Sequence, residues 1–254
     1  MAVNRFNYFS ENNNRKYCGS SQFKSFLKCP AMALAELNGE WQREESTSLL
    51  VGSYVDSWFE GTLDQFKAEH PEILKKDGTL KAEYTKADEI IARVSRDELF
   101  MKYMSGQKQA IRTGTIEGVP FKIKMDSYHK GKAIVDLKVI KDFEPLWNEE
   151  RGIRQDFIQY WGYDYQAAIY QAVEGNKLSF YICAVTKEKE PDFAVIQIPQ
   201  NWIDSAMAII KNEIGLIDAY KKGDIEAPRC EKCAYCRQTK KLSRVMSADE
   251  FIVS

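Results

Sequence analysis

Three residues in the middle of the chain have the types and the spacing for metal-assisted chemistry on a phosphate. Asp126 ends one alternating run, and Asp136 and Lys138 follow in a second run after a polar turn. Strand side chains alternate between faces, so Asp136 and Lys138 point the same way, and antiparallel pairing brings Asp126 beside Asp136. Carboxylates that close repel unless a cation lies between them, and Mg²⁺ or Mn²⁺ suits oxygen ligands. The lysine can orient a water or stabilise phosphate charge.

A predicted helix over residues 48–66 carries two acids inside an apolar stripe. Asp56 and Glu60 are four residues apart and therefore share one helix face. Gly52 lets the start of the helix pack close to a strand or to DNA. The alternative is an ordinary exposed acidic face.

A second predicted helix, over 156–174, presents neutral hydrogen-bonding groups at helical spacing. They are Gln159, Tyr163, Gln166 and Tyr170. Such groups suit contacts to phosphates or bases beside a metal site. The alternative is an amphipathic helix with its aromatic residues in the core, the fate expected of Trp161 and Tyr165.

The cysteines form a triplet near the end of the chain that needs a fourth partner. The triplet is Cys230, Cys233 and Cys236. Cys29 is the best candidate for the fourth ligand and Cys18 the second, while Cys183 lies in an apolar run and is expected to be a buried small hydrophobe. A cytoplasmic location argues against disulfides. Structural zinc usually takes cysteines in two separated pairs, so the tight triplet with a remote fourth cysteine fits an iron–sulfur cluster better.

The pattern along the chain predicts a mixed sheet flanked by helices, an α/β (α+β mixed) fold. Helices are expected over 20–37, 48–66, 84–104, 156–174 and 201–221. Strands are expected over 110–115, 119–127, 133–139, 178–186 and 193–198. We expect a single domain over 1–254, with residues 225–254 as a cysteine-bearing tail tied to the helix near Cys29.

Composition constrains partners only weakly, because the net charge of the 254 residues is −1. No apolar run approaches the ~20 residues of a membrane span, and the first residues lack a signal-peptide pattern, so a cytoplasmic protein without a membrane partner is expected. Neither His70 nor His129 belongs to a constellation that would support a serine-type triad.

Lysines and arginines gather in two places that could attract a phosphate backbone. Those around the candidate carboxylates are Lys122, Lys124, Lys130, Lys132, Lys138 and Lys141. Those near the C-terminus are Arg237, Lys240, Lys241 and Arg244. The alternative is that these are solvated surface charges.

Taken together, these pieces resemble the PD-(D/E)xK nuclease superfamily, and most closely its RecB-type exonuclease branch with the phage and prophage RecE-like enzymes. Four family elements occur in order over about residues 50–170: the helical G-x-x-[HD] element at Gly52 to Asp56, the first metal carboxylate at Asp126, the D-x-K strand at Asp136 to Lys138, and the Q-x-x-x-Y helix at Gln166 to Tyr170. AddB-type and CRISPR-associated relatives also hold a [4Fe–4S] cluster between an N-terminal cysteine and a C-terminal triplet.

The resemblance implies a restriction-endonuclease-like core and a role for each matched residue. Asp126, Asp136 and the main-chain carbonyl of Leu137 would hold Mg²⁺ or Mn²⁺ with help from Asp56. Lys138 would orient the attacking water. Gln166 and Tyr170 would contact DNA. The ligands of the [4Fe–4S] cluster would be Cys29, Cys230, Cys233 and Cys236.

The chain departs from the family pattern at two places. Many RecB-type members have histidine where this chain has Asp56, although aspartate also ligates Mg²⁺ or Mn²⁺. The triplet is tighter than the C-x2-C-x5-C form of several relatives. Cluster type and metal identity, including Zn²⁺, therefore stay open.

The function implied is a metal-dependent DNA exonuclease in phage or prophage recombination or in DNA repair. Relatives often work beside a single-strand annealing recombinase, and some form rings, so a homo-oligomer is a further possibility. Two alternatives remain. One is an endonuclease on the same core, and the other is a non-catalytic DNA-binding module with a zinc knuckle.

Overall fold

A mixed five-stranded sheet forms the centre of the computed structural model, which describes residues 2–43, 46–149 and 151–249. Its strands, in spatial order, are β1 (Gln107–Ile116), β2 (Val119–His129), β3 (Ala133–Ile140), β6 (Ser179–Thr186) and β7 (Phe193–Gln197). β3 and β6 are parallel and the other neighbours are antiparallel. The predicted mixed sheet is confirmed.

The hairpin of β1 and β2 follows from its turn residues. Glu117 and Gly118 both have positive φ, at 47° and 79°. Two consecutive left-handed residues match the twist of antiparallel strands, so the turn fixes the register Ile116↔Val119 and all pairs beyond it. The carboxylate-bearing strand β2 is thereby paired with β1 along most of its length.

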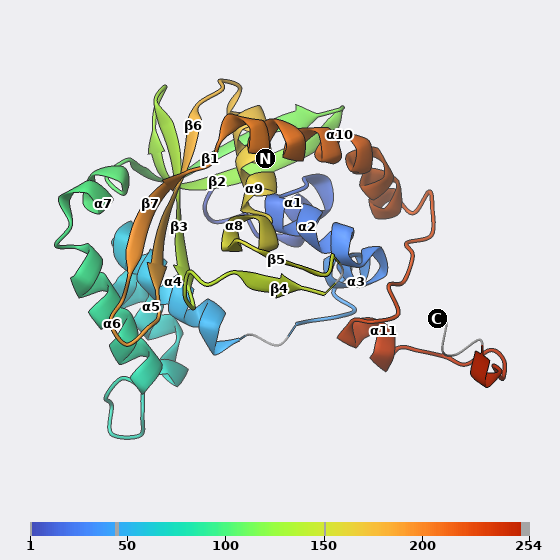
Figure 1. The fold of residues 1–254 in the computed structure, drawn as a ribbon, viewed down its shortest axis with the longest axis horizontal. Helices are drawn as coiled ribbons and strands as arrows, with labels where there is room; N and C mark the ends of the chain where they lie inside the picture. The colour runs from blue at the N-terminus through green and yellow to red at the C-terminus, as the bar shows by residue number, and fades with distance from the viewer. Residues whose placement is uncertain (1, 44–45, 150, 250–254) are drawn as a thin grey trace.

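Helices cover both faces of the sheet (Figure 1). One face packs against α4 (Thr47–Glu60), α6 (Ala82–Val94) and α7 (Glu98–Tyr103), with α5 (Leu63–Glu69) and the short 3-10 helix η1 (Pro71–Ile73) behind them. The other face packs against α9 (Tyr163–Glu174) and α10 (Gln200–Lys222), with α2 (Ser20–Lys28) and α3 (Pro30–Leu37) alongside. Two apolar cores result, one on each face, and the sheet separates them.

Four of the predicted helices are each divided into two. The helix over 20–37 breaks at Cys29, because Pro30 disfavours helical backbone in the residue before it. The helix over 48–66 ends at Gly61, and the helix over 156–174 is interrupted at Gly162, both glycines having left-handed φ. The helix over 84–104 ends at Ser95, and a new helix begins after Asp97, whose side chain caps it. The result is that α8 (Phe157–Tyr160) and α9 are separate helices.

Several short elements were not predicted. Helix α1 (Glu11–Lys16) begins where the Ser10 side chain accepts a hydrogen bond from the Asn13 N–H. A ribbon of β4 (Leu146–Asn148) and β5 (Ile153–Gln155) precedes α8, and α11 (Ala234–Gln238) lies in the tail. Elements this short carry too little periodicity to be read from sequence.

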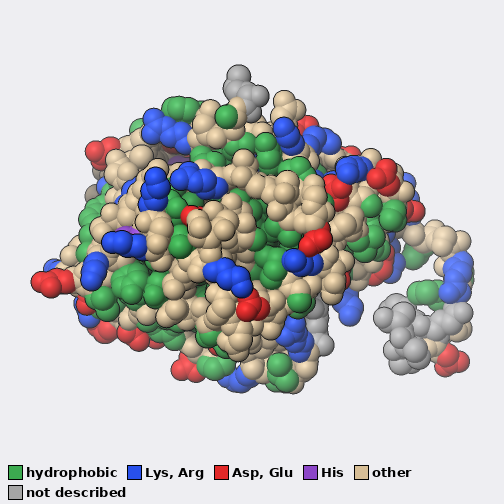
Figure 2. All heavy atoms as spheres, turned by 90° about the horizontal axis from the view of Figure 1, so that it is seen from above, with side chains coloured by type: hydrophobic (Ala, Val, Ile, Leu, Met, Phe, Trp, Pro, Cys, Tyr) green, Lys and Arg blue, Asp and Glu red, His purple; other side chains and the backbone are tan. Residues whose placement is uncertain are grey.

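Residues 240–249, which follow α11, stand away from the body of the molecule (Figures 1 and 2). Its apolar residues Leu242 and Val245 are strongly exposed. Among the residues that the structure describes, no helix has both the length and the apolar character needed to cross a membrane.

Candidate active site

The side chain of Asp126 binds the backbone of β3 at the point where β2 and β3 stop pairing. The two strands pair only from Ser127↔Val135 to His129↔Ala133. Beyond that point Asp126 Oδ2 accepts the N–H of Leu137 at 2.9 Å. On the other side of β2, Gln109 has a positive φ of 51°, and the pairing of β1 with β2 is interrupted at Gln109 and Asp126 without a change of register, so Asp126 has no pairing partner in β1. The predicted approach of Asp126 to Asp136 follows from this geometry.

Asp136 lies at the centre of a hydrogen-bonded group and is only 3% exposed. Its Oδ1 accepts the side-chain amide of Gln166 at 2.6 Å, and its Oδ2 makes an ion pair with Lys138 Nζ. Lys138 Nζ also lies 4.7 Å from the ring centroid of Tyr163. Burial alone would lower the pKa of Lys138, but Asp136, Tyr163 and Asp126 hold that pKa above its usual value. Lys138 is therefore a cation here.

Asp56 reaches the same place from helix α4. Burial, and then the neighbouring Glu60, raises the pKa of Asp56 to about 7. Burial, and then the charges of Asp136 and Asp56, also raises the pKa of Asp126 well above its usual value. Asp56 Oδ1 is buried without a hydrogen-bond partner among the described residues. Carboxylates that repel one another, with one buried oxygen left without a hydrogen bond, fit a hard divalent cation.

Gln166 and Tyr170 come from α9, one turn apart, and both are buried. Gln166 donates to Asp136, and the Tyr170 hydroxyl donates to the Lys124 carbonyl at 2.9 Å. Both therefore direct hydrogen bonds at the strands that carry the acids. Their predicted contact with DNA stays a prediction.

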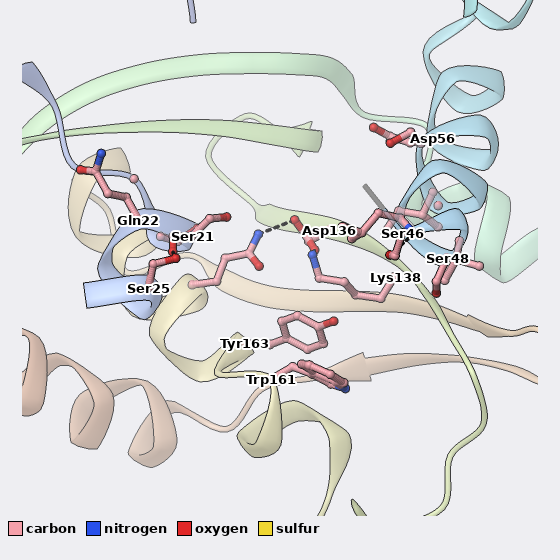
Figure 3. A pocket seen from close by; sticks show the side chains of 18 of the residues that line it. Ser21, Gln22, Ser25, Ser46, Ser48, Asp56, Asp136, Lys138, Trp161 and Tyr163 are labelled. Carbon is pink, nitrogen blue, oxygen red and sulfur yellow. Dashed lines mark hydrogen bonds and ion pairs between the residues drawn. The ribbon is translucent and has the colours of Figure 1, made fainter. Parts of the chain in front are cut away.

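A cavity of about 1640 Å³ opens over the acids (Figure 3). Its walls carry hydroxyl and amide side chains that the sequence analysis missed: Ser21, Gln22 and Ser25 from α2, and Ser46 and Ser48 from the start of α4. Isolated serines carry no sequence signal, and they become a group only because α2 and α4 flank the same cavity.

The predicted basic cluster around the carboxylates is only partly correct. Lys124, Lys138 and Lys141 line the cavity. Lys122 also borders it but is buried, and its Nζ donates to the Tyr8 carbonyl and to Asn14 Oδ1. Lys130 and Lys132 lie in the exposed turn between β2 and β3, because β2 runs on to His129 and carries the turn away from the acids.

The predicted single polar face over 156–174 is wrong, because Gly162 ends α8 and reorients the chain. Gln159 belongs to α8, while Tyr163, Gln166 and Tyr170 belong to α9. Trp161, expected in the core, is 44% exposed at this junction and lines the cavity. Tyr165 does pack against the core, as expected.

The four cysteines implied by the resemblance come together as one group of sulfur atoms. The Sγ atoms of Cys29, Cys230, Cys233 and Cys236 all lie within 4.8 Å of one another. Cys29 Sγ is 3.6 Å from Cys236 Sγ, and Cys230 Sγ is 3.9 Å from Cys236 Sγ. Cys18 is buried elsewhere, beside Phe121 of β2, so Cys29 is the fourth member and Cys18 is not.

Contacts around these sulfurs hold the tail against α3. The Ala31 N–H donates to the Pro228 carbonyl at 3.1 Å, and the rings of Trp41 and Tyr235 meet edge to face at 5.6 Å. Burial opposes ionisation of Cys230, but the backbone N–H groups of Lys232 and Cys233 outweigh it and lower the pKa of that thiol to about 6. A thiolate among clustered thiols is a metal ligand by its chemistry, so this cluster can bind a metal.

The splayed β2–β3 pair, its acids and the helix that supports them define a PD-(D/E)xK core. The family described as "PDDEXK-like domain of unknown function (DUF3799)" matches residues 19–239, and the chain belongs to this family. No curated protein matches it. The crystal structure of a protein named "Putative exonuclease" from Eubacterium rectale is 45% identical, with a TM-score of 0.93 over 99% of this chain and 98% of that one. The predicted superfamily and fold are confirmed, and both findings support a nuclease.

Proposed function

We propose that this chain is a DNA exonuclease that depends on Mg²⁺ or Mn²⁺, built as a single nuclease domain with residues 225–254 as a tail tied near Cys29. The observation that carries the proposal is the buried Asp136 with the half-buried Asp56 and Asp126, which line a large cavity beside the cationic Lys138. The pKa values of Asp56 and Asp126 are raised by burial and by the neighbouring carboxylates, so these acids repel one another when ionised. A bound divalent ion would relieve that repulsion.

The three carboxylates and the Leu137 carbonyl would hold the ion, which supplies charge neutralisation at the phosphate and activation of water when bound. Lys138 Nζ has donors beyond its contact with Asp136, so it can orient a water for in-line attack on phosphorus. Gln166 fixes the Asp136 carboxylate through the 2.6 Å hydrogen bond. The Leu137 N–H fixes Asp126 in the same way. The acids are thus oriented before substrate arrives.

Digestion of end-labelled linear duplex beside covalently closed circular DNA tests the proposal. With Mg²⁺ or Mn²⁺ we expect loss of the linear DNA alone, and with chelator no loss of either. Cleavage of the circle would instead identify an endonuclease. DNA binding with no cleavage under any metal condition would identify a binding module.

The biological setting follows from the resemblance rather than from geometry. We propose a cytoplasmic role in phage-type recombination or in DNA repair, beside a single-strand annealing recombinase, and an oligomer that encloses DNA is a further possibility. Co-purification with such a recombinase and a measured mass in solution would test these two points separately.

For the cysteine site we favour one zinc ion over the cluster implied by the resemblance. Four zinc–sulfur bonds of about 2.3 Å in a tetrahedron place the sulfurs about 3.8 Å apart. The distances of 3.6 and 3.9 Å agree with that spacing. In a [4Fe–4S] cluster each cysteine binds a different iron, so the sulfurs lie farther apart than around a single ion.

Elemental analysis and an absorption spectrum of anaerobically purified protein decide between the two. One zinc per chain without visible absorption would support the single ion. Four irons per chain with a brown chromophore, both lost in a Cys233→Ser variant, would support the cluster.

A further inference from the structure

Trp161 places an exposed indole inside the catalytic cavity. It is 44% exposed, although tryptophan burial is strongly favourable. Figure 3 shows its ring beside Tyr163, and Tyr163 lies between Trp161 and Lys138. Scattered exposed apolar side chains are normal on a protein surface. An exposed aromatic face within a cavity that holds the reacting groups is a surface for a ligand.

The chain fixes this indole from several sides. The Trp161 carbonyl accepts the Lys24 Nζ at 2.9 Å, which ties it to α2. The Tyr160 ring meets it edge to face at 4.9 Å, and Lys28 Nζ lies 5.9 Å from the indole centroid. The left-handed Gly162 then turns the chain sharply into α9, with its would-be Cβ position 2.9 Å from Lys24. Because the indole is already positioned, stacking on it requires little ordering.

A second aromatic ring is exposed in the same cavity. Phe9 is 71% exposed, lines the cavity and lies 5.3 Å from Lys124 Nζ. Two exposed rings accompanied by lysines match the way single-stranded nucleic acids are held, with bases stacked on aromatic side chains and phosphates near cations. The face of a base inside a duplex is covered by its neighbours in the stack. An aromatic platform of this kind therefore selects unpaired nucleotides.

We propose that Trp161 is a stacking platform for an unpaired nucleobase next to the scissile phosphate, and that the substrate is a single-stranded or frayed DNA end. The proposal rests on the proposed function, because it assumes that DNA enters this cavity. Tyr163, two residues further along, lies against Lys138, so a base on Trp161 would lie close to the reacting groups. Stacking is tolerant of base identity, so little sequence preference is expected.

The test measures binding in the presence of chelator, where no cleavage occurs. The probes are a short fluorescent oligothymidylate and a hairpin duplex of equal charge, whose loop is a non-nucleotide linker and whose open end is closed by a cross-link, so that it presents no unpaired base. Trp161→Ala should bind the oligothymidylate roughly tenfold to a hundredfold more weakly, and Trp161→Phe should recover most of the loss. The hairpin should be bound equally by all variants. Trp147→Ala is the matched control, because Trp147 is 55% exposed but is not among the described residues that line the cavity.

Salt dependence and an abasic scan separate stacking from a general loss of structure. The loss in Trp161→Ala should leave the slope of affinity against salt unchanged, because no phosphate contact is removed. One abasic position should weaken wild-type binding and have no further effect in Trp161→Ala. The inference is overturned if Trp161→Ala binds the oligothymidylate as wild type does, or loses affinity equally for the hairpin. If Trp161→Ala gives either of these results while wild type binds and cleaves DNA, the stacking proposal fails and the proposed function stands. If wild type binds neither probe, the stacking proposal and the proposed function both fail.

Discussion

The acid cluster and the cysteine cluster are two candidate metal sites that the fold assembles in opposite ways. Asp126 and Asp136 lie on neighbouring central strands, and Asp56 lies on a helix packed on the sheet. The cysteines come instead from the junction of α2 and α3 and from a tail that contains the five-residue helix α11. The first site is a product of the core. The second connects a weakly packed segment to that core.

This contrast predicts opposite responses to metal. The carboxylates of the acid cluster repel one another on elements of the folded core, so a cation there stabilises a site that already exists. At the cysteine cluster, few apolar contacts other than those of the cysteines attach the tail to the core. Metal binding and local folding are therefore coupled there. Removal of metal should abolish cleavage at the acid cluster without unfolding it. At the cysteine cluster it should release the tail from the core.

Among variants that leave the three acids in place, the largest effect is expected from replacing the lysine of the acid cluster. Lys138→Ala should reduce cleavage by roughly 10²–10³-fold, since a positioned charge next to the phosphate is lost. Single-turnover digestion of linear DNA measures this, and circular dichroism reports on the fold. Lys132→Ala, in the exposed β2–β3 turn, is the control and should cleave normally. Cleavage by Lys138→Ala within a few-fold of wild type would remove Lys138 from the mechanism.

A second effect should be confined to the tail. Cys29→Ser should lose the bound metal and expose the segment after Pro228 to protease at least about tenfold faster, while the sheet stays protected, because metal binding orders this region. Limited proteolysis with mass spectrometry locates the cuts. Cys183→Ala, in the core strand β6, is the control that should retain the metal. Equal protection of the tail in Cys29→Ser would mean that packing alone holds it.

A smaller effect should be visible in the pH dependence of stability without metal. The pKa of Asp56 is raised to about 7 in the folded protein, so the folded state binds a proton that the unfolded state has released. The free energy of unfolding must then fall as pH rises from about 4, the ordinary pKa of aspartate, to about 7. At pH 8 in chelator, Asp56→Asn should have a higher Tm than wild type, by about 2–4 °C for each kcal/mol gained in the free energy of unfolding. At pH 5 the difference in Tm should be much smaller. A melting difference independent of pH would show that Asp56 does not titrate in this range.

The smallest effect is expected from one surface cation of the cavity. The Lys141 side chain is 90% exposed, pairs with Asp142 at 3.1 Å and lines the cavity. Lys141→Ala should weaken DNA binding a few-fold. It should also reduce the slope of log affinity against log salt concentration, here called the salt slope, by about one. Lys130→Ala removes the same charge from the exposed turn outside the cavity and should leave the slope unchanged. Identical slopes for both variants would mean that DNA does not pass Lys141.

The sequence was sufficient for the sheet, because alternating residues and the Glu117–Gly118 turn are local signals. It was also sufficient for the meeting of Asp126 with Asp136 and of Cys29 with the C-terminal triplet, the second through resemblance. It was insufficient where one residue redirects a helix, as at Cys29 before Pro30 and at Gly162. The exposure of Trp161 follows from the turn at Gly162, and no periodicity could have indicated it.

The residues of the cavity wall could not be predicted from the sequence for a different reason. Ser21 and Ser48 are unremarkable one at a time, and only the packing of α2 and α4 beside the sheet places both on one cavity. Lys122 was misassigned because burial against Tyr8 and Asn14 depends on α1, which was itself not predicted.

The most direct test of the account is the cleavage of linear DNA by wild type and by Asp136→Asn, with Mg²⁺ and with chelator. Asparagine keeps the shape of the side chain but removes the charge at the centre of the cluster. We expect wild type to degrade the DNA only with Mg²⁺, and Asp136→Asn to bind it without degrading it. Degradation by Asp136→Asn at the wild-type rate would contradict the assignment of this cluster as the catalytic site.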